Sequence, residues 1–493
     1  MCFAYLLRRC SSLCKLQAAH AVATTTGITF HHPAANLTSL LQSLTLLRPL
    51  PPPSLSLPYA LSLFHFLPNS TSTVAHNLLI RLFLSVVPSS PLPAIHLFSR
   101  LRRLSLPPDL HSFPLALSAS SRLRLLPLGR AFHAQSLRFG FSSNLFVRNA
   151  LISLYSSCSS LPDAENIFLD NNHAIDIVSY NALIHGYAKA GNLKNAQQLF
   201  NQMLQRDAIS YGTMIVAYSH SGQHSDALQL FDQMQSDGFT PDNVALVSAL
   251  SSCSQMGQLN RGKAIHDYIR RNRDELSVSL LTGLIDMYAK CGEINIALNL
   301  FNGSSSRNLF TWNSIIVGLA MHGYGKLSLD YFDKMRAARV KPDGVTFLGV
   351  LVACSHSGFV ETARRVFCDM ERVYGVRIEL KHYGCMADLF GRAGMIEEAM
   401  EMIEEMPMKG DGYVWGSVLS SCRIHRGNVE VAEVAARKLL EIDPGDTGVY
   451  SILASIYADE RRWEDVQRIR RIMDAIKVKK NIGFSFVHLP GNV

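Results

Sequence analysis

A short unit recurs along most of this chain, and this internal repetition constrains the fold more than any other feature. The period lies between 31 and 36 residues. Three segments show it directly: "IVSYNALIHGYAKAGNLKNAQQLFNQMLQRD" from Ile177, "AISYGTMIVAYSHSGQHSDALQLFDQMQSDGFTPD" from Ala208 and "LFTWNSIIVGLAMHGYGKLSLDYFDKMRAARVKPD" from Leu309. A chain of 493 residues built in this way need not divide into several globular domains.

Each repeat has the pattern of two amphipathic helices. Apolar residues recur at steps of three and four, as at Tyr180, Leu183, Ile184 and Tyr187. A glycine followed by a helix-starting residue separates the two helices, as in "KAGN" at 189–192, which suits a left-handed stop before a new first turn. Because a single helical hairpin cannot bury its apolar face, the repeats must stack, which predicts an all-α superhelical solenoid.

Composition and charge narrow the functional classes. Apolar residues make up 48% of the chain and charged residues 17%, but no window approaches the roughly 18 uninterrupted apolar residues of a membrane span, so we expect no membrane partner. Residues 1–108 contain eight Lys or Arg and no acid, which leaves 39 basic and 39 acidic residues in 109–493. Because residues 109–493 carry equal numbers of basic and acidic side chains, we do not expect binding through a bulk basic patch.

The N-terminal segment has the composition of a targeting sequence. Residues 1–36 contain no acid and carry Arg8, Arg9 and Lys15 among apolar and hydroxyl side chains. These features are typical of an organellar transit peptide, so we exclude residues 1–36 from the fold. We favour the mitochondrion as the destination, with the chloroplast as the alternative.

Three cysteines recur in one sequence context, near the middle of a predicted helix. They are Cys253 in "LSSC", Cys354 in "LVAC" and Cys422 in "LSSC". No two cysteines form C-x-x-C. We therefore expect small buried thiols at helix contacts rather than metal or redox sites.

Helical repeats of this length occur in tetratricopeptide proteins, which bind proteins, and in pentatricopeptide proteins, which bind RNA. The strings "SYNALIHGYAKAG", "TGLIDMYAKCG", "VKPDGVTFLGVLVACSHSG" and "HYGCMADLFGRAGMIEEA" closely resemble the plant pentatricopeptide family, in its PLS subfamily of alternating repeat types. The resemblance covers about residues 73–480 and implies a right-handed superhelical solenoid of helix-turn-helix repeats.

The resemblance divides the chain as follows. A repeat array of about ten repeats fills 73–411, and residues 37–72 form a degenerate repeat broken by "PLPPP". The long-type repeats are 110–144, 243–277 and 344–379; the others are 73–109, 145–176, 177–207, 208–242, 278–308, 309–343 and 380–411. Residues 412–480 resemble paired E-type motifs of RNA-editing factors, and 481–493 resemble the opening of a further extension.

The resemblance implies that the fifth and last residues of each repeat together read one RNA base. In the non-long repeats these pairs are Asn77 with Asp109, Asn149 with Asp176, Asn181 with Asp207, Gly212 with Asp242, Thr282 with Asn308, Asn313 with Asp343, and Gly384 with Asp411. Val74, Phe146, Val178, Ile209 and Phe310, three residues before the first reader, are placed to sandwich the base. Asn with Asp favours uracil, Thr with Asn favours adenine, and the two glycine repeats predict no base.

These residue types have a second, structural explanation, because Asn, Thr, Gly and Asp near a helix start are ordinary N-cap residues. The long-type repeats argue for reading, since they place Pro114, Val247 and Leu348 at the first reader position although their helices also need caps. An Asn amide can both donate and accept, which discriminates base edges.

We find no catalytic constellation. Editing enzymes of the family carry a zinc deaminase with H-x-E and C-x-x-C, and neither string occurs here. We therefore expect no enzyme activity, no catalytic or metal site and no cofactor.

The expected function is sequence-specific binding of single-stranded RNA, as a site-recognition factor for C-to-U editing. Its partners would be organellar RNA and a deaminase recruited in trans, with other editing factors, through residues 412–493. Organellar RNA stabilisation, splicing or translation is the alternative, and a tetratricopeptide-like protein scaffold is a third.

Overall fold

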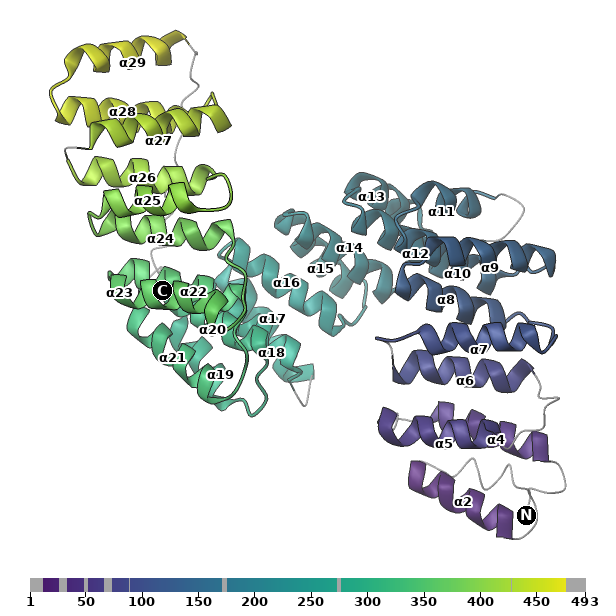
Figure 1. The fold of residues 1–493 in the computed structure, drawn as a ribbon. Helices are drawn as coiled ribbons and strands as arrows, with labels where there is room; N and C mark the ends of the chain where they lie inside the picture. The colour runs from purple at the N-terminus through teal and green to yellow at the C-terminus, as the bar shows by residue number, and fades with distance from the viewer. Residues whose placement is uncertain are drawn as a thin grey trace. The chain divides into compact units, whose positions relative to one another are not determined.

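The computed structural model describes residues 12–25, 33–47, 52–65, 73–87, 89–170, 175–272, 276–426 and 428–475. These residues form 27 α-helices and no strand, which confirms the all-α prediction (Figure 1). The chain divides into two compact bodies, an N-terminal body of Met1–Ala249 and a C-terminal body of Leu250–Val493.

The helices follow one another along each body in chain order (Figure 1). The N-terminal body contains α2 (Leu13–Thr25), α4 (Pro33–Leu46), α5 (Pro53–His65), α6 (Thr73–Val86), α7 (Leu92–Arg103), α8 (Ser112–Leu123), α9 (Leu126–Arg138), α10 (Leu145–Ser157), α11 (Leu161–Phe168), α12 (Ile177–Lys189), α13 (Leu193–Gln202), α14 (Ala208–His220), α15 (His224–Ser236) and the start of α16 (Asn243–Gln255). The C-terminal body contains α17 (Leu259–Asn272), α18 (Val278–Lys290), α19 (Ile294–Gly303), α20 (Leu309–Met321), α21 (Gly325–Ala337), α22 (Gly344–Ser357), α23 (Val360–Arg372), α24 (Leu380–Arg392), α25 (Ile396–Glu405), α26 (Gly412–Ile424), α27 (Val429–Ile442), α28 (Thr447–Asp459) and α29 (Trp463–Ala475).

The helix limits follow the sequence signals. Helices α12, α14, α20 and α22 begin directly after Asp176, Asp207, Asn308 and Asp343, whose side chains accept a hydrogen bond from a backbone N–H of the first turn. The predicted left-handed stops are also present: in the turn after α12, the φ of Gly191 is 75°. Two helices lie within each of the ranges predicted as repeats from 73 to 411.

The hairpins pack in two layers. The first helix of a repeat contacts its own second helix and the first helix of the next repeat, as α20 contacts α21 and α22. Small residues permit this close approach. A Cβ atom on Gly186 would lie 2.6 Å from Cβ of Ser156, and one on Gly318 would lie 2.5 Å from Cβ of Ala289. Larger side chains at these contacts would push neighbouring repeats apart.

The N-terminal helices correct one of our expectations. Leu13 and Leu16 of α2 are buried in one apolar cluster with Leu40 and Leu44 of α4. Part of the segment 1–36, which we excluded from the fold, therefore packs as the rest of the body does. The transit role of this segment stays a prediction, as do the domain limits, and residues 476–493 lie outside the described residues.

The degenerate repeat predicted at 37–72 also contains two helices. Helices α4 and α5 contact each other, and both contact α6. Of the residues of "PLPPP", Pro53 begins α5, and 49–51 lie outside the described residues.

The three recurrent cysteines are buried, as predicted, with exposed fractions of 0% for Cys253 and Cys354 and 3% for Cys422. Burial raises the pKa of the Cys354 thiol to about 11 and that of Cys422 to about 11. These thiols belong to the apolar core between helices.

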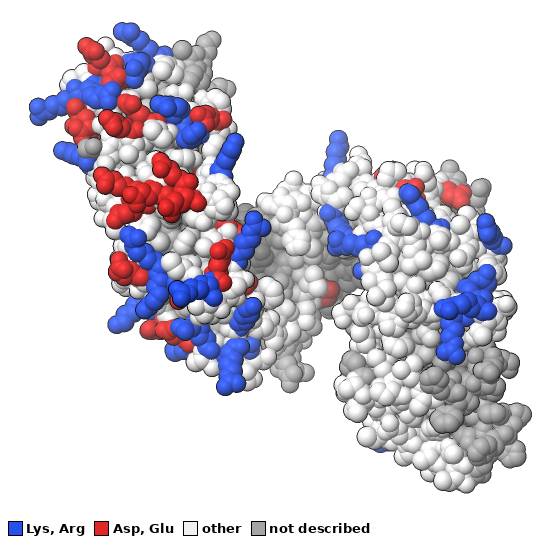
Figure 2. All heavy atoms as spheres, in the orientation of Figure 1, with Lys and Arg blue, Asp and Glu red and all other residues white. Residues whose placement is uncertain are grey.

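Charge is unevenly spread over the surface. Figure 2 shows a largely uncharged surface on the N-terminal body and a group of acidic side chains over α25, where the sequence reads "IEEAMEMIEE". In the part of the chain that the structure describes, no helix combines the length and apolar character needed to cross a bilayer.

Candidate nucleic-acid interface

The structure brings together four of the predicted reading pairs. In each, the side-chain amide of the Asn donates to the carboxylate of the Asp that ends the same repeat. The donor–acceptor distances are 2.8 Å for Asn77–Asp109, 3.1 Å for Asn149–Asp176, 3.1 Å for Asn181–Asp207 and 2.9 Å for Asn313–Asp343. We call these the Asn–Asp pairs.

In three of the four pairs, the Asp also caps the next helix. Asp207 accepts from the backbone N–H of Ser210, and Asp343 accepts from that of Thr346, both in a capping box. The structural explanation is thus correct for these three Asp residues. It is wrong for the Asn residues, because Asn181 and Asn313 lie in the second turn of their helices, beyond any cap position.

The best-connected pair shows how the side chains are held. The Thr346 hydroxyl donates to Oδ1 of Asn313 at 2.6 Å, while Nδ2 of Asn313 donates to Asp343. Burial raises the pKa of Asp343, but the hydrogen bonds from Thr346 and Asn313 outweigh it and hold this pKa below its ordinary value. Asp343 is therefore an ionised acceptor that fixes the orientation of the Asn313 amide.

Thr282 and Asn308 are connected through a third residue. The hydroxyl oxygens of Thr282 and Thr311 lie 2.9 Å apart, and the Thr311 hydroxyl donates to Oδ1 of Asn308 at 2.9 Å. This arrangement leaves Asn308 exposed, unlike the Asp of the Asn–Asp pairs.

A row of exposed apolar side chains lies beside the reading positions. It contains the five predicted sandwich residues and three others at the same place in their repeats, with exposed fractions from 42% to 66%: Val74, Phe146, Val178, Ile209, Val244, Phe310, Val345 and Tyr413. We call these eight residues the apolar row. The predicted sandwich residues come from the non-long repeats alone and do not include Val244, Val345 and Tyr413, although the position of these three in the repeat is visible in the sequence.

Two cavities open between members of this row. One, of about 350 Å³, is lined by Val74, Phe146 and the pair Asn77–Asp109. The other, of about 420 Å³, is lined by Ile209, Val244, Gly212 and Asp242. Exposed apolar walls with polar groups between them are the features expected for stacking and hydrogen bonding of a planar ring.

In the second glycine repeat, a neighbouring side chain occupies the corresponding place. A Cβ atom on Gly384 would lie 2.4 Å from Cδ1 of Tyr413, so the tyrosine ring covers the place where a reading side chain would stand. Asp411 caps α26 by accepting from the backbone N–H groups of Tyr413 and Val414.

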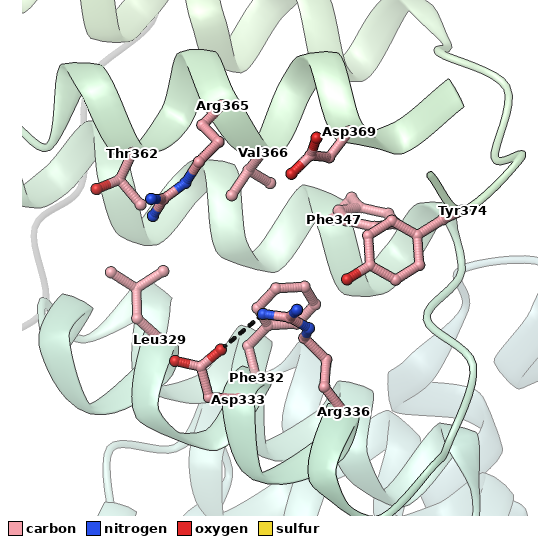
Figure 3. A pocket seen from close by; sticks show the side chains of 10 residues that line it. All are labelled: Leu329, Phe332, Asp333, Arg336, Phe347, Thr362, Arg365, Val366, Asp369 and Tyr374. Atoms are coloured by element: carbon pink, nitrogen blue, oxygen red, sulfur yellow. Dashed lines mark hydrogen bonds and ion pairs between the residues drawn. The ribbon is translucent and has the colours of Figure 1, made fainter. Parts of the chain in front are cut away.

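A further cavity, of about 460 Å³, lies among the second helices α21 and α23 (Figure 3). Its walls combine the rings of Phe332, Phe347 and Tyr374 with charged side chains, and Arg336 pairs with Asp333 at 3.1 Å. None of the predicted reading residues lines it. Among the described residues, no group of three or more His, Cys, Asp or Glu could hold a metal ion.

Fold and site together define a helical-repeat protein that presents paired polar side chains and exposed apolar side chains at a fixed place in successive repeats. Family models match the chain at "PPR repeat" (171–204, 279–308, 310–340, 345–373 and 381–411), "PPR repeat family" (206–255) and "E motif" (426–488). The chain belongs to the plant pentatricopeptide repeat family, and its E motif is consistent with the PLS subfamily.

Relatives in Arabidopsis thaliana match over most of the chain. Pentatricopeptide repeat-containing protein At5g61800 is 47% identical, with 98% of each chain covered. The mitochondrial protein At2g22410 is 40% identical over 81% of this chain and 58% of its own, and the chloroplastic protein At1g08070 is 37% identical over 78% and 47%.

Solved structures of the family match weakly in three dimensions. The crystal structure of the pentatricopeptide repeat protein PPR10 from maize has 18% identity and a TM-score of 0.48, with 97% of this chain and 89% of that chain covered. The same protein in complex with an 18-nt psaJ RNA element has a TM-score of 0.37, with coverage of 97% and 85%.

Proposed function

We propose that this protein binds single-stranded RNA, one base per repeat, between successive members of the apolar row. The observation that carries the proposal is that an exposed apolar side chain lies beside an Asn–Asp pair in several repeats. Exposed Phe, Ile and Val side chains cost free energy in water, and covering them with a base face recovers it. Membership in the pentatricopeptide repeat family supports this reading.

The Asn–Asp pairs supply the selectivity of the proposed site. An Asn amide carries two N–H donors and one acceptor, so an amide that donates once to Asp still has a hydrogen for a base. Because the Asp fixes the amide orientation, the Asn presents one defined pattern to the base edge. From the family resemblance, we assign uracil to the four Asn–Asp pairs and adenine to Thr282 with Asn308.

The repeats in chain order then specify a pattern of bases. It reads U, any, U, U, open, any, A, U, any, open, where "any" stands for a long-type repeat and "open" for a glycine repeat. Fluorescence anisotropy with a labelled RNA of this pattern tests the proposal. Affinity should fall when U at the Asn313 position is replaced by G, and an affinity indifferent to every base would contradict sequence-specific binding.

We further propose that the RNA task is recognition of sites for C-to-U editing. The E motif at 426–488 supports this role, since an E-type ending has no evident task in simple protection of an RNA end. The deaminase would come from a partner recruited through residues 412–493.

The proposed compartment is a plant organelle, the mitochondrion first and the chloroplast second. The acid-free composition of residues 1–36 and the names of relatives described as mitochondrial or chloroplastic support this proposal. A fusion of the full chain to a fluorescent protein, observed in plant cells, discriminates between the two compartments.

Transcript sequencing decides between editing and other RNA tasks. Organellar RNA from a plant that lacks this protein should lose C-to-U conversion at one or a few sites preceded by the pattern above. Intact editing with changed transcript abundance, ends or splicing would favour the alternative of RNA stabilisation, splicing or translation. No RNA change at all would favour a protein scaffold.

A further inference from the structure

Positive charge is concentrated in the first two repeats of the array. Residues 73–144 contain eight arginines, no lysine and one acidic residue, Asp109, so the formal net charge of this stretch is +7. The single carboxylate is already engaged, because Asp109 accepts hydrogen bonds from Asn77 and Ser112. On the face that Figure 2 shows, basic side chains lie over α7–α9 with no acidic one among them.

Three of these arginines lie at the C-terminal ends of two second helices. Helix α7 ends with Arg102 and Arg103, and α9 ends with Arg138; all three are exposed. The two helix ends are in contact, because the guanidinium carbon of Arg102 lies 4.8 Å from the ring centre of Phe139, the residue that follows α9. We call Arg102, Arg103, Arg138 and Phe139 the arginine edge.

The arginine edge lies next to the first reading position. The loop from Arg103 leads directly to Asp109, and within it the Pro107 carbonyl accepts from the Thr73 hydroxyl, at the start of α6, at 2.8 Å. The loop after α9 leads in the same way to Phe146. Asp109 and Phe146 both line the cavity of about 350 Å³. An RNA strand that leaves this cavity past the first repeat therefore comes close to the arginines.

Arginine at a helix C-terminus also has a structural role, because a cation there complements the helix dipole. That role does not require three exposed guanidinium groups at two adjoining helix ends, where like charges repel one another. Among the described residues, these three arginines have no ion-pair partner, whereas Arg130 of the same stretch pairs with Asp163 at 2.8 Å. Their charge is therefore available to an anion.

The chemistry of the arginine edge suits a nucleic acid. A guanidinium group binds phosphate oxygens through two parallel hydrogen bonds, which gives it both charge and geometry for this ligand. The planes of Arg102 and Phe139 can also stack with an unpaired base, as aromatic and guanidinium groups do in proteins that bind single-stranded RNA.

We propose that Arg102, Arg103 and Arg138 bind the phosphates of RNA that extends beyond the base opposite repeat 73–109, whatever its sequence. This inference rests on the proposed RNA-binding function. It adds a contact outside the reading positions, so the protein should need an RNA longer than the pattern for its full affinity. An anionic lipid surface also carries phosphates, but the position of the arginines beside a reading cavity favours RNA.

The test uses the full chain and three labelled RNAs in an anisotropy titration. One RNA is the pattern alone, the second extends it by about six nucleotides beyond its first base, and the third carries the same extension beyond its last base, lengths that leave several phosphates for contact. The extension beyond the first base should strengthen binding, and the extension beyond the last base should not.

Salt dependence measures the phosphate contacts directly. On a single strand, the slope of log affinity against log salt changes by about 0.7 for each phosphate neutralised. Arg103→Gln with Arg138→Gln keeps the contact of Arg102 with Phe139 and should lower the slope by about 1.4 on the RNA extended beyond its first base. A fourfold rise in salt should then weaken the wild type about sevenfold more than this variant.

A matched control removes the same charge elsewhere. Arg270 and Arg271 are exposed and end α17, the second helix of the long-type repeat 243–277. Arg270→Gln with Arg271→Gln should keep the wild-type slope. Arg103→Lys with Arg138→Lys retains the charge and should keep most of the slope, and circular dichroism checks that every variant is folded.

The outcomes separate this proposal from the proposed function. If replacement of U by G at the Asn313 position weakens binding but the extension has no effect, the arginine edge does not bind RNA and the reading function stands. Equal loss of slope from the two double Gln variants would also overturn the role of the edge. If neither the base nor the extension matters, the proposed function itself fails.

A last measurement tests the membrane alternative. The full chain is mixed with vesicles of anionic phospholipid and sedimented, and we expect no difference between the wild type and Arg103→Gln with Arg138→Gln. Vesicle binding that the double variant loses, together with no effect of the RNA extension, would assign the arginine edge to a lipid surface and overturn the RNA assignment.

Discussion

The amide of Asn313 donates to the carboxylate of Asp343 at 2.9 Å, and the same carboxylate caps helix α22. One side chain therefore orients a reading residue and stabilises the first turn of the next repeat. This double role ties base recognition to the packing of successive hairpins, so substitutions at the two positions should have separable effects.

Asp343→Ala should lower both stability and RNA affinity, whereas Asn313→Ala should chiefly lower affinity for RNA with U at that position. Loss of the cap should reduce the free energy of unfolding by about 1 kcal/mol. Denaturation followed by circular dichroism and anisotropy on the same samples measure the two effects. Asp343→Asn is the matched control, because Asn retains the cap; a loss of stability as large as that of the Ala variant would contradict the capping role.

The pKa of Asp343 makes a pH dependence testable. Because hydrogen bonds hold this pKa below its ordinary value of 3.8, the ionised form stabilises the fold above that pH, and this contribution is lost as the pH falls through the folded-state pKa. The stability difference between the wild type and Asp343→Asn should therefore shrink in acid. Denaturation of both proteins at pH 7 and pH 3 measures it, and an unchanged difference would show that the carboxylate is not stabilised by its partners.

The apolar row should contribute to binding through stacking. Phe310→Ala should weaken RNA binding by between about 1 and 3 kcal/mol, the range for an aromatic side chain that stacks on a base. Leu204, which is at least as exposed but lies in the loop after α13, supplies the control. Leu204→Ala should bind RNA as the wild type does, and equal losses from both substitutions would mean that the row has no special role.

Tyr413 should close the reading position of the last repeat. With its ring over Gly384, we expect the base opposite repeat 380–411 to have no effect on the affinity of the wild type. Tyr413→Ala combined with Gly384→Asn should create a pair with Asp411 and a preference for uracil there. Anisotropy with four RNAs that vary this base tests the double variant, and a clear preference in the wild type would refute the closure.

The buried thiols should resist modification in the folded protein. Burial raises the pKa of Cys354 to about 11 and that of Cys385 to about 12, so almost no reactive thiolate exists at pH 8. Mass spectrometry after brief maleimide treatment should find Cys368, which is exposed, labelled and the two buried cysteines unlabelled. Denaturant should expose all three, and rapid native labelling of Cys354 would indicate that α22 opens locally.

The sequence by itself determined the helical layout of this protein. The period of the repeats, the glycine stops such as Gly191 and the polar caps such as Asp207 are local signals, and the helices begin and end where these signals stand. The pairing of Asn181 with Asp207 was expected from the family resemblance, and a regular repeat places equivalent residues of every hairpin at equivalent points.

The tertiary structure alone decided what surrounds each reading position. Gly212 and Gly384 are the same residue type at the same place in a repeat, but one opens a cavity and the other lies under Tyr413. Likewise, the composition of residues 13–25 predicted no packing, although Leu13 and Leu16 are buried against α4. The physical reason is the same in both cases. The space and the burial around a residue depend on side chains from another helix, and a local sequence pattern does not specify how close that helix lies.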